Sequence, residues 1–347
     1  MPNELRFATV NLRAASDAEY AALNAFHNTL RAEQLPDDPP VPLELDRAIW
    51  QLAPELLVRQ AWGLWQGETL AALAIADFTD TPENRHVLNV SLRVVPDWRR
   101  RGLARQLLHA VVEYAEPLGR RLFFLLAHDT VPAGAAFLER VGAECGLETH
   151  INQLALADLS TALLAEWLRR GAAASERFEL LFWDGATPEP YLEELCRLIE
   201  IINTAPRGTL EVEDFRLTPE HIRQWEQAVE ARGQVDWMAV VRERATGRFA
   251  GFTNVVWHPA QPWLVHQGGT GVYPDFRGNG LGQWLKAAML DRLLRERPEA
   301  RFVRTENADV NAAMLKINDA LGFRPYVSEC IWQVELSKVR AYLDQTA

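Results

Sequence analysis

The feature that most constrains this chain is a loop motif that occurs twice. In residues 270–283, TGVYPDFRGNGLGQ, an apolar run ends at Val272, a proline turn follows, and three glycines lead into a helical pattern. Residues 92–105, LRVVPDWRRRGLAR, have the same construction. At one constant offset, these residues match: Val94, Pro96, Asp97, Arg99, Gly102, Leu103 and Leu107 with Val272, Pro274, Asp275, Arg277, Gly280, Leu281 and Leu285. The repeat predicts an internal duplication of a unit of domain size.

Each copy joins a strand to a helix through a glycine-containing loop. After the second loop, Leu281, Leu285, Met289 and Leu293 recur every fourth residue, which predicts one apolar stripe of a helix. The first backbone N–H groups of a helix lack partners within the helix and carry the positive end of its dipole. Glycines let such a backbone approach a phosphate closely, so the motif predicts an anion cradle suited to a diphosphate.

Length and composition limit the kind of protein. The 347 residues are enough for two cores, and no apolar run is long enough to span a bilayer. The first residues lack the pattern of a signal peptide. Cys145, Cys196 and Cys330 are widely separated, which predicts small buried side chains in a reducing cytosol. We therefore expect a cytoplasmic protein without membrane association.

The net charge of −11 opposes binding to nucleic acid, because a general nucleic-acid binder needs excess Lys and Arg. Most of the acidic residues are expected on the solvated surface. The order of apolar runs and turns repeats in the two halves and predicts a mixed α/β (α+β) fold, each half a mostly antiparallel sheet wrapped by helices. We expect a first domain over 1–158, a linker over 159–175 made of a short helix from Ser160 and a small, flexible joint at 171–175, and a second domain over 176–347.

The pattern Val-x-Pro-x-x-Arg-x-x-Gly-x-Gly/Ala before a helix resembles the acetyl-CoA signature of the GCN5-related N-acetyltransferases (GNAT). Residues 305–311 and Leu321-Gly322-Phe323 resemble the next strand and helix of that family. The resemblance covers both halves, so the chain resembles tandem members of the family. It implies an enzyme that transfers an acetyl group from acetyl-CoA to a primary amine of a small molecule, by direct attack in a ternary complex and without a metal.

The resemblance also implies which residues hold the co-substrate. The backbone of Thr270, Gly271 and Val272 would pair with the pantetheine arm, and a free N–H near Val272 would polarise the thioester carbonyl. Asn311 would bond the cofactor arm, cap the following helix, or do both. The cradle residues of the second half are Arg277, Gly278, Asn279, Gly280, Leu281, Gly282 and Gln283. Those of the first half are Leu92, Arg93, Val94, Arg99, Arg100, Arg101, Gly102, Leu103, Ala104 and Arg105.

Candidate proton-transfer groups lie near the second cradle. His266 is six residues before Val272, where relatives often have a glutamate base, and Glu306 is a second candidate base. His266 has the alternative of a polar strand residue. Relatives often have a tyrosine acid at the position of Asn318, which has no proton to give at neutral pH. Water, Tyr326 or another group would then protonate the leaving thiolate, or the thiolate would leave unassisted. Glu211, Glu213 and Asp214 are candidates to attract a cationic substrate or, alternatively, plain surface carboxylates.

The first half has lost more of the pattern, since Leu88, Val131 and Leu138 stand at the positions of His266, Asn311 and Asn318. We expect a degenerate first domain that is structural or holds coenzyme, and a catalytic second domain. The alternatives are a non-catalytic acyl-CoA binder or sensor, and a tandem enzyme that takes aminoacyl-tRNA as its donor, which the phosphate cradles and acidic charge oppose. The tandem predicts either a monomer that mimics a dimer or a homodimer.

Overall fold

The computed structural model describes residues 5–345 and divides them into two compact units. Unit 1 comprises residues up to Thr149 together with Arg207–Glu213 and the chain from Val327 onward. Unit 2 comprises His150–Pro206 and Asp214–Tyr326. None of the helices within residues 5–345 is long and apolar enough to cross a membrane.

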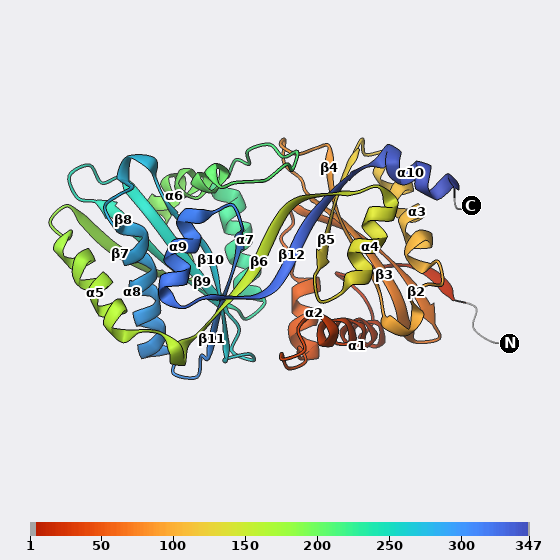
Figure 1. Cartoon of the computed structure of the whole chain (residues 1–347), viewed down its shortest axis with the longest axis horizontal. Coiled ribbons are helices and arrows are strands. Elements are labelled where there is room, and N and C mark those ends of the chain that lie inside the picture. Colours follow the sequence, from red (N-terminus) through yellow and green to blue (C-terminus); the bar gives the residue numbers. More distant parts are fainter. Residues whose placement is uncertain (1–4, 346–347) are drawn as a thin grey trace. The chain divides into compact units, whose positions relative to one another are not determined.

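Unit 1 is a six-stranded sheet in the order β1-β2-β3-β4-β5-β12, covered by helices (Figure 1). Strands β4 and β5 run parallel, whereas β1–β2, β2–β3, β3–β4 and β5–β12 are antiparallel. One apolar cluster joins the sheet to α3 and α10, and another joins the opposite face to α1. Its elements are β1 (Arg6–Val10), α1 (Asp17–Gln34), α2 (Leu43–Gln51), β2 (Leu57–Gln66), β3 (Thr69–Thr79), β4 (Val87–Val94), α3 (Leu103–Ala115), β5 (Leu122–His128), α4 (Pro132–Val141) and α10 (Leu336–Gln345).

Unit 2 repeats this plan with the strand order β7-β8-β9-β10-β11-β6. Strands β10 and β11 are parallel, and β7–β8, β8–β9 and β9–β10 are antiparallel. Helices α5 and α8 share an apolar cluster on one face of the sheet, and α6 and α7 share one on the other. Its elements are α5 (Thr161–Ala173), β7 (Phe178–Asp184), α6 (Leu192–Ile199), a 3-10 turn η4 (Glu200–Thr204), α7 (Pro219–Ala231), β8 (Val235–Glu243), β9 (Phe249–Trp257), β10 (Leu264–Val272), α8 (Leu281–Glu296), β11 (Phe302–Ala308) and α9 (Ala312–Leu321). The mixed, mostly antiparallel fold predicted for each half is confirmed.

The compact units differ from the contiguous domains 1–158 and 176–347 because two strands pass from one unit to the other. Strand β6 (Glu144–Ala155) begins in unit 1, and its residues from His150 belong to unit 2. Strand β12 (Arg324–Glu335) begins in unit 2, and its residues from Val327 complete the sheet of unit 1, pairing Glu329–Glu335 with β5. Each sheet is therefore completed by a strand from the other half of the sequence.

The helix predicted within the segment 159–175 is present as α5, which packs into unit 2 and continues to Ala173, where the sequence predicts a flexible joint. Ser160 caps α5 by accepting from the N–H of Leu163, and Leu164, Trp167 and Gly171 are buried. A Cβ on Gly171 would lie 2.2 Å from two atoms of the Trp284 ring on α8. Gly171 thus serves close helix packing, a role that its small, flexible neighbours concealed in the sequence.

The cysteine prediction is wrong for two of the three residues. Cys145 and Cys330 form a disulfide within unit 1, with their Cα atoms 6.0 Å apart and a sequence separation of 185. The separation concealed the pair because β12 returns to unit 1 only at the end of the chain. Cys196 is a buried thiol as predicted, and its burial raises its pKa to about 11.

Candidate active site

Each unit has a strand that separates from its parallel neighbour. In unit 2, β10 pairs with β11 from Leu264 to His266, and the strand continues to Val272. Its pairing with β9 shifts register between Gln267 and Thr270, which marks a β-bulge at the point of separation. In unit 1 the parallel pairing of β4 with β5 likewise ends at Asn89, although β4 continues to Val94. The separated part of each strand presents a backbone edge beside the cradle.

The loops that follow the separated strands have matching backbone conformations. Gly278 and Gly280 have φ angles of 80° and 72°, and Arg100 and Gly102 at the same positions of unit 1 have 65° and 79°. Both Gly280 and Gly102 are left-handed N-caps of the helix that follows. A side chain resists this conformation, so Arg100 is held in it by the surrounding fold. The structure thus has two copies of one backbone cradle.

In each loop an arginine side chain forms a hydrogen bond with the end of the preceding strand. The Nε of Arg277 donates to the carbonyl of Val272 at 3.1 Å, and the Nε of Arg99 donates to that of Val94 at the same distance. The Arg99 guanidinium also forms an ion pair with Glu33 on α1. The phosphate-binding role predicted for Arg99 therefore competes with two partners inside unit 1. Arg101 bonds the carbonyl of Asp97 and lies over a tryptophan ring.

The first residue of α3 and of α8 can offer a ligand its backbone N–H but not its side chain. Leu103 and Leu281, both predicted as cradle residues, point into the cores of their units. Asn279 donates from its side-chain amide to the carbonyls of Phe276 and Arg277, which tightens the loop. The N–H groups at the N-terminus of the helix are available to an anion, as the motif predicts.

Strand β10 is rich in glycine, whereas β4 is not. A Cβ on Gly271 would lie 2.5 Å from Ile201, and one on Gly269 would lie 3.0 Å from Ile202 and Phe252. The equivalent residues of β4 are Arg93 and Ser91. The glycines therefore let the 3-10 turn η4 pack directly on the separated strand of unit 2. Because β4 has side chains at these two positions, its sequence does not favour the same close packing in unit 1.

The two candidate bases lie on one face of the unit 2 sheet. His266 is the cross-strand partner of Arg304, and Glu306 is two residues further along β11. Side chains alternate along a strand, so His266 and Glu306 point to the same face, and both are exposed. Asn311 is the N-cap of α9 and accepts from the N–H of Met314, which confirms the capping alternative.

Asp236 is a carboxylate on the same face that was not among the residues predicted from the sequence. Asp236 and His266 are both cross-strand partners of Val256, on either side of β9. Burial is the main cause that raises the pKa of Asp236 to about 6, opposed by a hydrogen bond that its Oδ1 accepts from Asn254 at 3.3 Å. An acidic residue within an apolar strand is the signal that could have identified it.

Replacing Asp236 by asparagine is expected to stabilise the protein above pH 6. A carboxyl whose pKa is raised on folding binds its proton more tightly in the folded state, so stability is lost as pH rises from about 4 to 6. Asparagine removes the ionisation and retains an acceptor for Asn254. After allowance for partial exposure, we expect a gain of about 1–2 kcal/mol at pH 8 and none near pH 3.5. Urea unfolding at both pH values measures it, with exposed Asp319→Asn as control; equal gains at both pH values would contradict the assignment.

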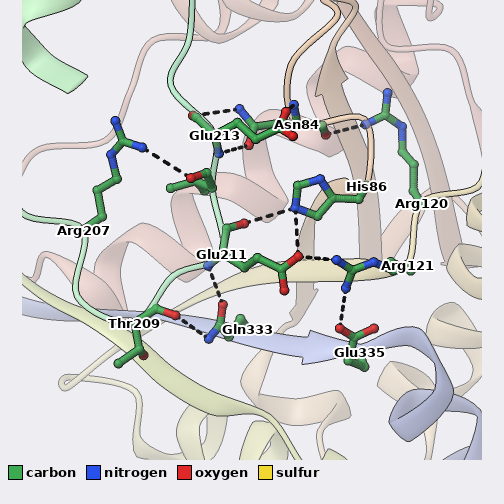
Figure 2. A network of polar contacts seen from close by, with 11 residues as sticks. Asn84, His86, Arg120, Arg121, Arg207, Thr209, Glu211, Glu213, Gln333 and Glu335 are labelled. Carbon is green, nitrogen blue, oxygen red and sulfur yellow. Dashed lines mark hydrogen bonds and ion pairs between the residues drawn. The ribbon is translucent and has the colours of Figure 1, made fainter.

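In the acidic segment 211–214, Glu211 and Glu213 do not leave their carboxylates available for a cationic substrate. Glu211 forms ion pairs with Arg121 and His86, and Glu213 accepts from the backbone N–H of Asn84 at 2.7 Å (Figure 2). Gln333 of β12 donates to the carbonyl of Thr209 at 2.9 Å in the same network. Residues 207–213 thus attach to unit 1 as a structural strap, which corrects the substrate role considered for Glu211 and Glu213.

Three comparisons with known proteins bear on this site. Residues 23–143, which lie in unit 1, match the Acetyltransferase (GNAT) family. The chain is 27% identical over 279 residues to "Mycothiol acetyltransferase" of Thermobifida fusca (strain YX), covering 77% of this chain and 79% of that protein. It also resembles the structure of a tandem GNAT protein from the clavulanic acid biosynthesis pathway, with a TM-score of 0.78, 26% identity, and coverage of 96% of this chain and 99% of that one.

A GCN5-related N-acetyltransferase from Sphaerobacter thermophilus has the same fold, with a TM-score of 0.64 at 14% identity over 95% of this chain and 96% of that one. The fold, the paired cradles and these matches define the class of the protein as an N-acetyltransferase. Residues 23–143 match the GNAT family, and the chain as a whole has the fold of a tandem, two-unit GNAT protein. Within residues 5–345, no group of three or more His, Cys, Asp or Glu side chains is placed to hold a metal ion.

Proposed function

We propose that unit 2 transfers an acetyl group from acetyl-CoA to a primary amine of a small molecule. The observation that supports this most is the conjunction of a separated strand, β10, with a cradle that opens directly onto it. An edge of unpaired backbone and a helix N-terminus are what an extended arm ending in a diphosphate requires. Acetyl-CoA has this shape and supplies an activated thioester. The name of the T. fusca relative supports the acetyl group as the one transferred.

The chain's own residues position the reactants. The backbone of Thr270, Gly271 and Val272 holds the arm, and the N–H groups of Gly278–Gln283 hold the diphosphate. A backbone N–H near Val272 donates to the thioester oxygen and stabilises the oxyanion that forms there. The amine attacks directly, so orientation within the ternary complex contributes much of the rate.

Proton transfer falls to the face that carries His266, Glu306 and Asp236. Asp236, with a pKa near 6, is ionised at neutral pH and is suited to hold a cationic amine. His266 or Glu306 then takes the ammonium proton before attack, directly or through water. The leaving thiolate takes a proton from water, since Asn318 has none to give.

We propose that unit 1 holds coenzyme or serves a structural role without chemistry. The cradle geometry at Arg100 and Gly102 supports coenzyme binding, as does the family match of residues 23–143. The apolar residues Leu88, Val131 and Leu138 oppose catalysis there. We further propose that the protein is a cytoplasmic monomer or homodimer that acts on a small molecule and does not bind nucleic acid.

The experiment is to count bound acetyl-CoA by calorimetry, locate it in a crystal, and measure thiol release against a panel of small primary amines. We expect coenzyme in the unit 2 cradle and turnover with at least one amine. Binding without turnover would favour the alternative, a non-catalytic acyl-CoA sensor, which the asparagine at position 318 supports. An empty unit 2 cradle in saturated crystals would contradict the proposal.

A further inference from the structure

A lysine is buried in unit 2 without a carboxylate partner. Lys286 on α8 is 1% exposed, and its Nζ donates to the Oδ1 of Asn318 at 2.8 Å and to the Oε1 of Gln267 at 3.5 Å. The ring of Phe323 is 5.3 Å from the same nitrogen. All three partners are neutral. Burying an ammonium without a counter-charge is costly, and burial accordingly lowers the pKa of Lys286 to about 7.

Nearby ionisable groups do not compensate this charge. The elements packed against α8 include α5, β8, β9 and β10, and β9 has no ionisable side chain. Asp236 on β8 and His266 on β10 project from the sheet face opposite to Gln267, because side chains alternate along a strand. Burial is the one cause of the lowered pKa of Lys286. The ionisable residues of the other neighbours are Glu166, Arg169 and Arg170 on α5, Arg242 and Glu243 on β8, Arg304 and Glu306 on β11, and Lys316 and Asp319 on α9.

The first hydrogen-bond chain runs from Lys286 to β10. An ammonium only donates, so the carbonyl oxygen of Gln267 faces it and the amide nitrogen faces away. That nitrogen donates to the Oγ1 of Thr253 at 2.7 Å, and the Thr253 hydroxyl is 2.7 Å from that of Thr270. In the arrangement that continues the chain, in which successive hydrogen bonds polarise one another, Thr253 donates in turn to Thr270. The hydrogen of the Thr270 hydroxyl is then directed outward.

The second chain runs from Lys286 to β11. The Oδ1 of Asn318 faces the ammonium, and its Nδ2 donates to the Oδ1 of Asn307 at 2.6 Å. The Asn307 amide N–H groups then point away from the lysine. Thr270 and Asn307 both lie beyond His266 and Arg304, the last paired residues of β10 and β11. The two chains thus end on the two strands that flank the separation.

Unit 1 shows that the fold does not require this network. The residues equivalent to Lys286, Asn318, Thr253 and Thr270 are all apolar, namely Leu108, Leu138, Ala74 and Leu92. Three of these four are fully buried, and Leu92 packs against the same core. The chain has three lysines among 36 Lys and Arg residues, and the other two are exposed. The chain uses arginine at nearly all of its cationic positions, yet the cationic residue buried in α8 is a lysine, which burial is able to deprotonate.

We propose that Lys286 is a positioning residue whose ammonium aligns both hydrogen-bond chains, so that Thr270 and Asn307 donate to the negative charge that develops between β10 and β11. The proposal rests on acetyl transfer in unit 2. In that step the bond from the amine nitrogen to the acetyl carbon forms, and the bond from carbon to sulfur breaks. Lys286 keeps its proton throughout; the amine proton goes to the base, and the thiolate takes one from water. Neutral lysine no longer enforces the donor direction, so turnover should fall as pH rises through the lysine's pKa.

The test compares the full-length wild type with Lys286→Met and with the double variant Lys286→Leu/Asn318→Leu, which copies the pair present in unit 1. Lys316→Met, on the exposed face of α9, is the control. With acetyl-CoA and the best amine of the panel, we expect both variants to lose about 10- to 100-fold in kcat while the Kd for acetyl-CoA changes less than about threefold. The fall in kcat above pH 7 should disappear in both. The double variant should remain folded, because unit 1 accommodates the same residues.

Selective isotope labelling of the three lysines supplies a readout independent of turnover. By NMR, Lys286 should titrate near pH 7, and its signal should shift when acetyl-CoA binds, with Lys316 and Lys338 as internal references. An active wild type with an equally active double variant would overturn the role of Lys286 alone. A Lys286 that titrates above pH 9 would contradict the predicted fall in turnover above pH 7. A wild type that binds acetyl-CoA but acetylates no amine would overturn the proposed function, and this inference with it.

Discussion

Valine at Gly280 is expected to lower kcat/KM for acetyl-CoA by about 30- to 100-fold, the equivalent of about 2–3 kcal/mol of binding free energy. Gly280 caps α8 with a φ of 72°, a conformation that a β-branched residue adopts only with strain of about 1–3 kcal/mol. The loop relieves this strain by moving, and the N–H groups that follow Gly280 then no longer converge on the diphosphate. Steady-state kinetics and calorimetry with acetyl-CoA measure the loss.

Gly102→Val is the matched control for this variant. Gly102 is the equivalent cap in unit 1, with a φ of 79°, and a Cβ at either glycine would have no neighbour closer than 3.9 Å. The two substitutions therefore impose the same backbone strain and should lower the thermal midpoint similarly. If chemistry resides in unit 2, Gly102→Val keeps kcat/KM within about threefold of wild type. A folded Gly102→Val protein without activity would show that unit 1 takes part in turnover.

The sequence predicts the cradles well because their physical basis is local. The proline turn, the left-handed glycines and the start of the apolar stripe lie within fourteen residues, and each limits the backbone conformation of its neighbours. Leu281, Leu285, Met289 and Leu293 are all buried as the stripe predicts. The fold class followed from the same local patterns, repeated in two halves.

Contacts between distant segments were not predictable in this way. The exchange of β6 and β12 depends on which sheet each strand joins. The alternation of side chains along a strand is the same in either sheet, so the sequence pattern does not distinguish the two sheets. Glu211 is of a residue type that could bind a cationic substrate, and only the structure shows that its carboxylate is paired with Arg121. Lys286 lies beside Leu285 in an amphipathic pattern, where a lysine is normally an exposed residue. Its burial became apparent only when Asn318 and Gln267 were seen around it.

Alanine at Gly171 is expected to destabilise the protein by about 2–3 kcal/mol, although alanine is the better helix former. The added methyl group would lie 2.2 Å from Cγ and Cδ1 of Trp284, so α5 and α8 must move apart. Trp284 directly follows Gln283, the last cradle residue, so this movement should also weaken acetyl-CoA binding by about three- to tenfold. Urea unfolding and calorimetry on the same protein measure the two effects.

Gly134→Ala provides the comparison, since Gly134 also lies within a helix, α4, and its Cβ would meet Ala127 at 3.6 Å, an ordinary contact. There the helix propensity of alanine is unopposed, and we expect unchanged stability or a gain of up to about 1 kcal/mol. Opposite signs for the two glycines would establish that residues 161–173 are a packed part of unit 2. A Gly171→Ala variant with unchanged stability would instead support the flexible linker that the small residues of this segment predict. In that case α5 would have no influence on the cradle at the start of α8.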